Sequence, residues 1–225
     1  METYTKKRSS DNVSILAGRV MLEGNISIPE GASGIVLFAH GSGSSRLSPR
    51  NLFVAEELNK KGIGTLLFDL LTPEEETVDL QTAQFRFDIQ MLAKRLADTT
   101  DWLLNNPSLS HLRIGYFGAS TGGGAALVAA SQRSRVVWAV VSRGGRPDLA
   151  GESLAGVKCP TLLIVGGNDD VVIELNRQAL AALRSEKKLV IIPGATHLFE
   201  EKGKLEEVAR YACDWFLRYL QEDKK

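Results

Sequence analysis

The sequence predicts a single α/β domain, residues 1–225, in which helices cover both faces of a mostly parallel β-sheet. Short apolar runs typical of strands alternate along the chain with longer segments of helical periodicity. Several of these runs, such as residues 34–39, are apolar throughout, which indicates strands buried on both faces. Neither an internal repeat nor a long linker interrupts the alternation, so one domain accounts for all 225 residues.

The first part of the chain is expected to begin with a β-hairpin that turns at Gly18. In order, the predicted elements are the hairpin (13–16 and 19–28), a strand (34–39), a helix (49–61) and a strand (63–68). A capping box then fits Thr72-Pro-Glu-Glu75, with Thr72 as N-cap and Glu75 at N3. This helix start explains the acidic run at 74–76, because negative charge is favourable at a helix N-terminus.

The rest of the chain continues the alternation with longer helices. Apolar residues recur at helical spacing over 83–104, which predicts an amphipathic helix that Asn105-Asn-Pro107 closes. The remaining elements are a strand (113–117), a helix rich in Gly and Ala (121–131), a strand (136–141), a short helix (147–154), a strand (161–165), a helix (173–184), a strand (189–192) and a final helix (201–220). Ligands of such sheets bind beyond the carboxyl ends of the strands, so the chemistry is expected in the loops that follow strands.

The segment Gly118-Ala-Ser-Thr-Gly122 is a GxSxG motif between a predicted strand and a predicted helix. In such a turn the serine, here Ser120, occupies a sharp and strained bend, and its small neighbours let the backbone pack closely. The N-terminal amides of the next helix then point at an oxyanion that forms on a substrate. The motif is short, and its position between strand and helix is what makes Ser120 a candidate nucleophile.

A serine nucleophile needs a base, and the base needs an orienting carboxylate. His197 directly follows the last predicted strand, and Asp169 and Asp170 directly follow the strand before it. The chain order Ser, Asp, His is the order found in α/β hydrolases. Because each residue follows a strand, all can meet at one edge of the sheet. We therefore expect a catalytic triad of Ser120, Asp169 and His197, with Asp170 as the alternative acid.

An oxyanion loop is expected at His40-Gly-Ser-Gly43, after the strand at 34–39. One oxyanion-hole amide lies in this loop and the second on the residue after the nucleophile, so the backbone N–H groups of Ser42 and Thr121 are the expected donors. The side chain of His40 is expected to brace the loop rather than to act as the base.

These motifs, together with Gly166-Gly-Asn-Asp169 and Gly194-Ala-Thr-His197, resemble those of the α/β-hydrolase family and, within it, the dienelactone-hydrolase-like group. The resemblance covers nearly the whole chain. It implies the α/β-hydrolase fold with an eight-stranded, mostly parallel sheet and one antiparallel edge strand. It also implies hydrolysis of an ester, thioester or lactone without a cofactor. In loops of this family the triad aspartate precedes one residue and then one or two valines, as in Asp169-Asp-Val-Val172.

The sequence departs from dienelactone hydrolases at the nucleophile, where those enzymes carry a cysteine and this chain has Ser120. The resemblance therefore points to a serine esterase rather than to dienelactone as the substrate. The chain is also similar to uncharacterised hydrolases sometimes joined to phosphoribosyltransferase domains, although we expect no such domain within residues 1–225. The segments between predicted strands are too short for a large cap domain, so an open site is expected.

Three arginines are candidates for recognising a negatively charged substrate. Arg143 follows the strand at 136–141 and precedes two glycines, which let the backbone bend close to a ligand. A guanidinium presents a fixed fork suited to a carboxylate. We expect Arg143, assisted by Arg146 or Arg46, to favour anionic esters or lactones. The alternative is that these arginines cap helices, brace loops or pair with the acidic run at 74–76.

Composition excludes several classes of protein. Lys plus Arg and Asp plus Glu both number 27, and this balance argues against a nucleic-acid partner. No apolar run approaches the ~20 residues that span a bilayer, and no apolar stretch follows the basic N-terminus as in a secretory signal. Cys159 and Cys213 form no CxxC, and the three histidines are scattered. We therefore expect neither a disulfide framework nor a metal site, and a reducing cytoplasm as the location.

The sequence thus predicts a cytoplasmic serine carboxylesterase-type hydrolase of small-molecule esters. It is expected to need no cofactor, to bind neither nucleic acid nor membrane, and to be a monomer or a homodimer. Two alternatives remain open. An acyltransferase or perhydrolase would use the same triad with another acceptor, and a non-catalytic binding protein would use only the fold. The intact triad favours an enzyme.

Overall fold

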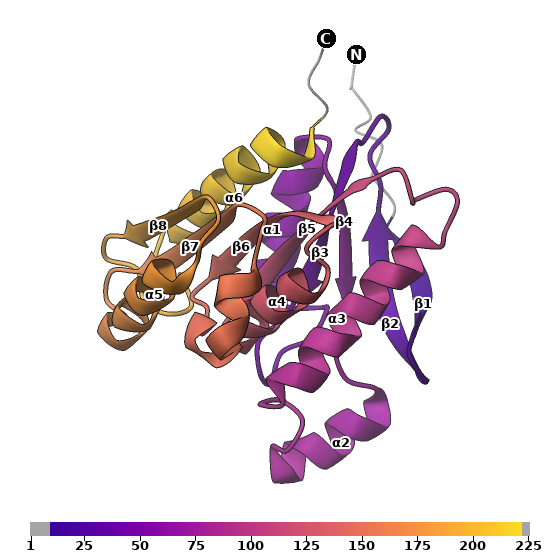
Figure 1. The fold of residues 1–225 in the computed structure, drawn as a ribbon, viewed down its shortest axis with the longest axis horizontal. Coiled ribbons are helices and arrows are strands. Elements are labelled where there is room, and N and C mark those ends of the chain that lie inside the picture. The colour runs from indigo at the N-terminus through magenta and orange to yellow at the C-terminus, as the bar shows by residue number, and fades with distance from the viewer. Residues whose placement is uncertain (1–9, 222–225) are drawn as a thin grey trace.

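The computed structural model describes residues 10–221, which fold around one eight-stranded sheet (Figure 1). The elements are, in chain order, β1 (Asp11–Ala17), β2 (Val20–Ser27), β3 (Gly34–Ala39), α1 (Pro49–Lys60), β4 (Gly64–Phe68), α2 (Pro73–Thr82), α3 (Ile89–Leu104), β5 (Arg113–Ala119), α4 (Thr121–Gln132), β6 (Val137–Arg143), the 3₁₀ segment η1 (Pro147–Gly156), β7 (Thr161–Gly166), α5 (Asp170–Ala182), β8 (Lys187–Ile192) and α6 (Lys204–Leu220). The predicted alternation of strands and helices is confirmed.

The strands lie in the order β1-β2-β4-β3-β5-β6-β7-β8. All neighbouring pairs from β4 to β8 are parallel, whereas β2 is antiparallel to both β1 and β4. The antiparallel strand was expected at the edge of the sheet, but it lies one position further in, because the hairpin adds β1 outside it. The longest connection, between β4 and α3, holds only α2, and no cap domain covers the described part of the chain.

Helices cover both faces of the sheet. One face carries α1 and α6, and the other carries α3, α4 and α5 with η1 (Figure 1). The central strands are buried on both sides because successive side chains point to opposite faces: Val140 belongs to the core under α3 and α4, and Ala139 and Val141 belong to the core under α1 and α6. This sandwich fixes the carboxyl ends of β3, β5, β6, β7 and β8 at one edge of the sheet.

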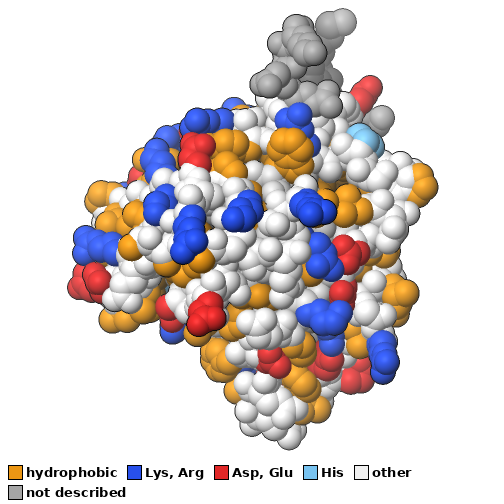
Figure 2. Space-filling model, in the orientation of Figure 1, with side chains coloured by type: hydrophobic (Ala, Val, Ile, Leu, Met, Phe, Trp, Pro, Cys, Tyr) orange, Lys and Arg blue, Asp and Glu red, His pale blue; other side chains and the backbone are white. Residues whose placement is uncertain are grey.

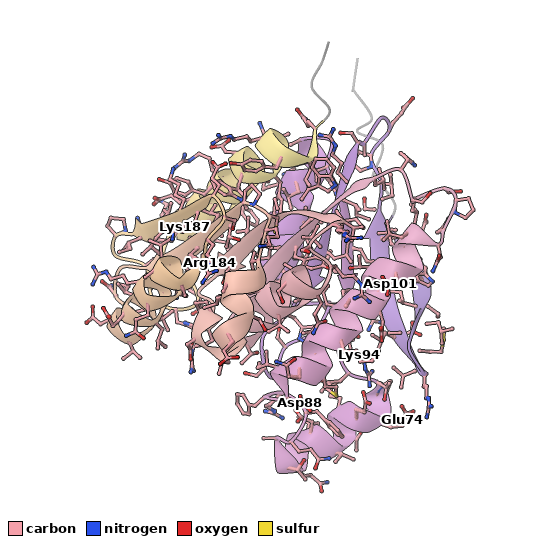
Figure 3. All side chains as sticks on the ribbon, viewed as in Figure 1. Glu74, Asp88, Lys94, Asp101, Arg184 and Lys187 are labelled. Atoms are coloured by element: carbon pink, nitrogen blue, oxygen red, sulfur yellow. The ribbon has the colours of Figure 1, made fainter. Side chains whose placement is uncertain are left out.

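The predicted capping box at the start of α2 is confirmed. The Thr72 side chain accepts the N–H of Glu75 at 3.2 Å, and the Glu75 carboxylate accepts the N–H of Thr72 at 2.9 Å. Glu75 also pairs with Arg95 of α3, which ties the start of α2 to the main body. The remaining acidic side chains of the run need no ligand to explain them, and Glu74 lies in the first turn of α2 (Figure 3).

The long helix predicted over 83–104 is shorter than expected, because α3 begins only at Ile89. Ala83 ends α2 in the left-handed conformation, with a φ of 55°. The carboxylate of Asp79 accepts the backbone N–H groups of Phe85 and Arg86 at 2.8 and 3.0 Å, which holds residues 83–88 as a loop. Asp88 then caps α3 by accepting the N–H of Met91 at 2.9 Å (Figure 3).

On the face in Figure 2, basic and acidic side chains are interspersed with apolar and uncharged ones. Among residues 10–221, no helix has both the length and the apolar character needed to cross a bilayer. Within the same residues, no three His, Cys, Asp or Glu side chains gather where they could hold a metal ion.

Candidate active site

Ser120 occupies a strained turn between β5 and α4. Its φ of 51° and ψ of −122° lie in a region that residues other than glycine rarely adopt. Three backbone hydrogen bonds hold it there. Its N–H donates to the Arg143 carbonyl at 3.2 Å, and its own carbonyl accepts the backbone N–H groups of Gly123 and Arg146 at 2.9 and 3.0 Å. The surroundings therefore enforce a conformation that the isolated residue disfavours, as a nucleophile turn requires.

The two glycines of the GxSxG motif are required by close contacts. A Cβ atom on Gly118 would lie 2.5 Å from the Gly122 carbonyl oxygen. A Cβ atom on Gly122 would lie 2.1 Å from the carbonyl oxygen of Ala39, at the end of β3. These approaches place the start of α4 directly beside the loop that follows β3.

Asp169 and His197 meet beyond the ends of β7 and β8. The Asp169 Oδ2 atom lies 2.7 Å from His197 Nδ1, so the carboxylate can accept the ring N–H. Asp170 is exposed and begins α5. Of the two aspartates considered from the sequence, only Asp169 contacts the imidazole.

The His197 ring packs against the backbone next to Ser120. A Cβ atom on Gly144 would lie 3.5 Å from His197 Nδ1, and the backbone carbonyl of the preceding residue, Arg143, accepts the N–H of Ser120. No hydrogen bond joins Ser120 Oγ to the ring within the described part of the chain. Such bonds are often long in enzymes without substrate and tighten when substrate binds. The structure thus brings the three predicted residues to one edge of the sheet.

The loop after β3 lies against Ser120 and is braced by His40. A Cβ atom on Gly41 would lie 3.1 Å from Ser120 Cβ. His40 is buried, its Nδ1 lies 3.0 Å from the Gly41 carbonyl oxygen, and its Nε2 accepts the N–H of Leu70 at 3.0 Å. This pattern needs a neutral ring with its proton on Nδ1. Burial lowers the pKa of His40, which keeps the ring in that form.

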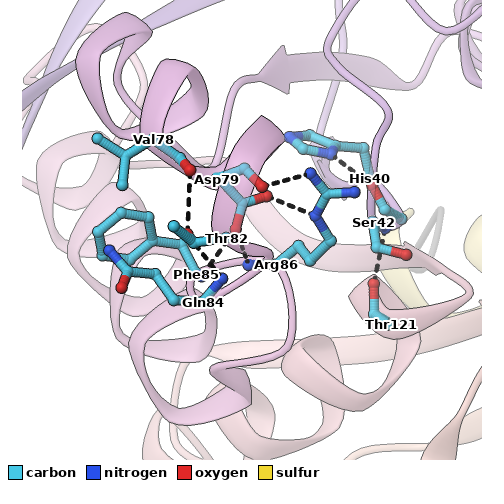
Figure 4. A network of polar contacts seen from close by, with 10 residues as sticks. His40, Ser42, Val78, Asp79, Thr82, Gln84, Phe85, Arg86 and Thr121 are labelled. Atoms are coloured by element: carbon cyan, nitrogen blue, oxygen red, sulfur yellow. Dashed lines mark hydrogen bonds and ion pairs between the residues drawn. The ribbon is translucent and has the colours of Figure 1, made fainter.

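The two residues expected to supply the oxyanion donors contact each other. The backbone N–H of Ser42 donates to Thr121 Oγ1 at 2.8 Å (Figure 4). Thr121 is also the first residue of α4, so its own N–H has no partner within the helix. The sequence placed both residues in one site, but it gave no signal for this hydrogen bond, which depends on the rotamer of a side chain.

A cavity opens beside this loop. Gly41, Ser42 and Thr121 form one wall, and four leucines make it largely apolar: Leu70, Leu71, Leu80 and Leu92. Glu76, Asp79 and Arg86 supply its charged groups. The cavity adjoins Ser120, because its wall residue Gly41 lies against that serine and Thr121 follows it in the chain.

The buried Asp79 and the half-buried Arg86 form an ion pair in the wall of the cavity (Figure 4). Arg86 Nε donates to Asp79 Oδ2 at 2.6 Å, and Arg86 Nη2 donates to the Asp79 carbonyl at 2.7 Å. Burial alone would raise the pKa of the Asp79 carboxyl, but the hydrogen bonds from the N–H groups of Arg86 and Phe85 and the guanidinium charge lower it by more, so the pKa lies below its ordinary value. Sequence reasoning did not identify this pair as part of the site.

Two of the three arginines proposed to bind an anion already have carboxylate partners. Arg46 pairs with Asp69, and Arg146 pairs with Asp148 through two hydrogen bonds of 2.9 and 2.8 Å. Neither contacts the acidic run at 74–76. The alternative that these arginines brace their own loops therefore has direct contacts in its favour.

Arg143 is buried on the α1 side of the sheet. Its Nη2 donates to Asn51 Oδ1 at 3.3 Å, its guanidinium lies 5.8 Å from the centre of the Phe199 ring, and its Nε has no partner. Burial, assisted by the nearby charge of Arg50, lowers the pKa of Arg143 to about 10. No carboxylate of the described residues pairs with it.

The chain is similar to known proteins over much of its length. Residues 77–225 match the family model described as PET hydrolase-like. The crystal structure of a dienelactone hydrolase from Anabaena variabilis shares 62% identity and a TM-score of 0.94, over 95% of this chain and 99% of that chain. The protein Est1E from Butyrivibrio proteoclasticus shares the fold at 17% identity, with a TM-score of 0.77 over 93% of this chain and 98% of that one.

A longer relative comes from Mycobacterium tuberculosis and is named "Putative phosphoribosyl transferase". It is 58% identical over 210 residues, which are 93% of this chain but 46% of the relative. The chain thus spans about half the length of this relative. From the fold, the arrangement at the sheet edge and these similarities, the chain belongs to the α/β-hydrolase family, in its dienelactone-hydrolase-like group.

Proposed function

We propose that this hydrolase cleaves small carboxylic esters, thioesters or lactones through a covalent acyl-enzyme on Ser120. One observation carries the proposal: a serine held at a φ of 51° shares a sheet edge with an imidazole that an aspartate contacts at 2.7 Å. A strained turn exposes the hydroxyl, and an oriented imidazole can take its proton. The family relationship adds support, because an esterase from Pyrococcus furiosus shares this fold.

In the proposed reaction, Ser120 Oγ attacks the substrate carbonyl while His197 Nε2 takes the hydroxyl proton. Asp169 keeps the other ring proton on Nδ1 and stabilises the imidazolium that forms. Backbone N–H groups at the start of α4 stabilise the negative oxygen of the tetrahedral intermediate. The imidazolium then protonates the leaving alcohol or thiol, and water activated by the same base releases the acid.

The cavity beside Ser42 and Thr121 is the proposed binding place for the apolar part of the substrate. Its leucine walls favour a hydrocarbon or aromatic group, since burying apolar surface is worth roughly 25 cal/mol per Å². Recognition of an anionic group by Arg143 stays a separate prediction. The guanidinium lies beneath the surface, so this role requires that a substrate carboxylate reach it through a local movement.

The decisive variant is Ser120→Ala. It should fold normally and lower kcat for p-nitrophenyl esters by several orders of magnitude, because no other group can form the acyl-enzyme. A screen of p-nitrophenyl esters of graded chain length would find the preferred substrate size. Retention of more than about a tenth of the esterase activity by the variant would overturn the proposal.

The acceptor of the acyl group needs its own test, because an acyltransferase or perhydrolase would use the same triad. Reaction in the presence of a competing alcohol or peroxide should still give mainly the free acid. A dominant transesterified or peracid product would instead assign the chain to one of those activities.

A further inference from the structure

The hydroxyl of Thr121 is a polar group of the site for which the mechanism above has no role. The side chain is buried, with 4% of the residue exposed, and it lines the cavity beside Gly41 and Ser42 (Figure 4). Its oxygen accepts the Ser42 N–H at 2.8 Å. One of the two amides expected to bind the oxyanion is therefore occupied by a neighbouring side chain in the free enzyme.

The proton of this hydroxyl has no partner of its own. A hydroxyl can donate one hydrogen bond and accept two, and in residues 10–221 the only hydrogen bond of the Thr121 side chain is the one it accepts. Buried polar groups usually use their hydrogen-bonding capacity. The free donor borders the cavity, so a group that enters the site from there can accept its proton.

We propose that Thr121 stabilises the oxyanion with its side chain as well as its backbone. Thr121 Oγ1 keeps the hydrogen bond from Ser42 and donates its own proton to the substrate oxygen as negative charge develops there. No proton is transferred; the hydrogen bond only strengthens as charge builds up. Accepting the Ser42 N–H polarises the hydroxyl and makes it a stronger donor. This inference rests on the proposed serine-hydrolase function.

The competing arrangement has Thr121 rotate away so that the Ser42 N–H binds the oxyanion directly. Threonine is branched at Cβ, so this rotation moves a methyl group into a new position as the hydroxyl leaves. At 4% exposure, neighbouring atoms would have to move with it. Retaining the observed rotamer avoids that rearrangement and still provides two donors from one residue.

The variant Thr121→Val tests the proposal, because valine keeps the shape and removes the hydroxyl. We expect kcat to fall about 100-fold, the effect of losing one oxyanion donor, with little change in KM. The inhibition constant of an alkylboronic acid, which forms a tetrahedral adduct with a nucleophilic serine, should rise by a similar factor. Thr121→Ser should recover most of both losses. Thr99→Val is the matched control, since this buried threonine bonds only within α3 and should leave kcat unchanged.

A Thr121→Val enzyme that keeps more than a third of its kcat, or that binds the boronic acid as tightly as the wild type, would overturn the proposal. If the variant does not fold, a crystal structure of the wild type with the boronic acid decides. Thr121 Oγ1 should lie within about 3.2 Å of both Ser42 N and a boronate oxygen, and a side chain rotated away would contradict us. Activity that persists in Ser120→Ala would instead refute the proposed function itself.

Discussion

The strain at Ser120 should be measurable as stability. Replacing the serine by glycine removes the unfavourable contacts of a Cβ atom at a φ of 51°, whereas replacing it by alanine keeps them. Both variants lack the hydroxyl, so both are expected to be inactive. Their difference in unfolding free energy therefore isolates the backbone conformation from the chemistry.

The expected size follows from two opposing effects. A residue held in a sparsely populated backbone region costs about 1–3 kcal/mol, and glycine releases this strain. Glycine also makes the unfolded chain more flexible, which destabilises the folded state by about 0.4–1 kcal/mol relative to alanine. At the midpoints of these ranges, about 2 and 0.7 kcal/mol, Ser120→Gly should be more stable than Ser120→Ala by about 1.3 kcal/mol. For a chain of this size, that corresponds to a Tm higher by roughly 3–5 °C.

Differential scanning calorimetry of the two variants would give the comparison. Ser131 in α4 provides the control, because its helical backbone favours alanine over glycine by about 1 kcal/mol and the order of stability should reverse there. If Ser120→Ala melts at the same temperature as Ser120→Gly or above it, the turn at Ser120 is not strained.

Three further predictions concern the neighbours of the serine. Asp169→Asn should lower kcat far more than Asp170→Asn, because only Asp169 contacts the imidazole. The opposite order in steady-state kinetics would show that Asp170 is the triad acid instead. Burial lowers the pKa of His40, so the unfolded chain takes up a proton as the pH falls below about 6.5 while the folded ring resists it. The free energy of unfolding should therefore fall from pH 7 to pH 5, and less steeply in His40→Gln, which urea titrations can measure; equal slopes would contradict the assignment. Arg143→Met should raise KM for an anionic ester and spare a neutral one if Arg143 binds the anion, whereas a lowered Tm without a change in selectivity would show that it is structural.

Much of the architecture could be predicted from local patterns. The apolar strands, the capping box at Thr72 and the order of the three site residues all depend on neighbours in sequence or on the rule that parallel strands end at one edge. The position of the antiparallel strand depends on pairing between distant segments. The loop at 83–88 depends on the buried Asp79 carboxylate, whose backbone partners lie six and seven residues further along the chain.

The details of the site were harder to predict, for a physical reason. Arg143 ends β6, whose central residues are apolar on both faces, so its sequence position does not show which face its side chain takes. The structure directs it toward α1, where it bonds to Asn51. The contact between Ser42 and Thr121 likewise joins residues 79 positions apart through one rotamer. Periodicity and spacing contain no information about such contacts.

Covalent labelling reports directly on whether Ser120 is an activated nucleophile. A fluorophosphonate reacts with a serine only when a neighbouring base activates the hydroxyl, so intact-mass and peptide analysis of the treated protein report on the nucleophile itself. We predict a single adduct on the peptide that contains Ser120, absent from Ser120→Ala and strongly slowed in a His197→Ala variant. A wild-type protein that stays unlabelled at Ser120, or an adduct that forms equally in Ser120→Ala, would rule out Ser120 as the nucleophile.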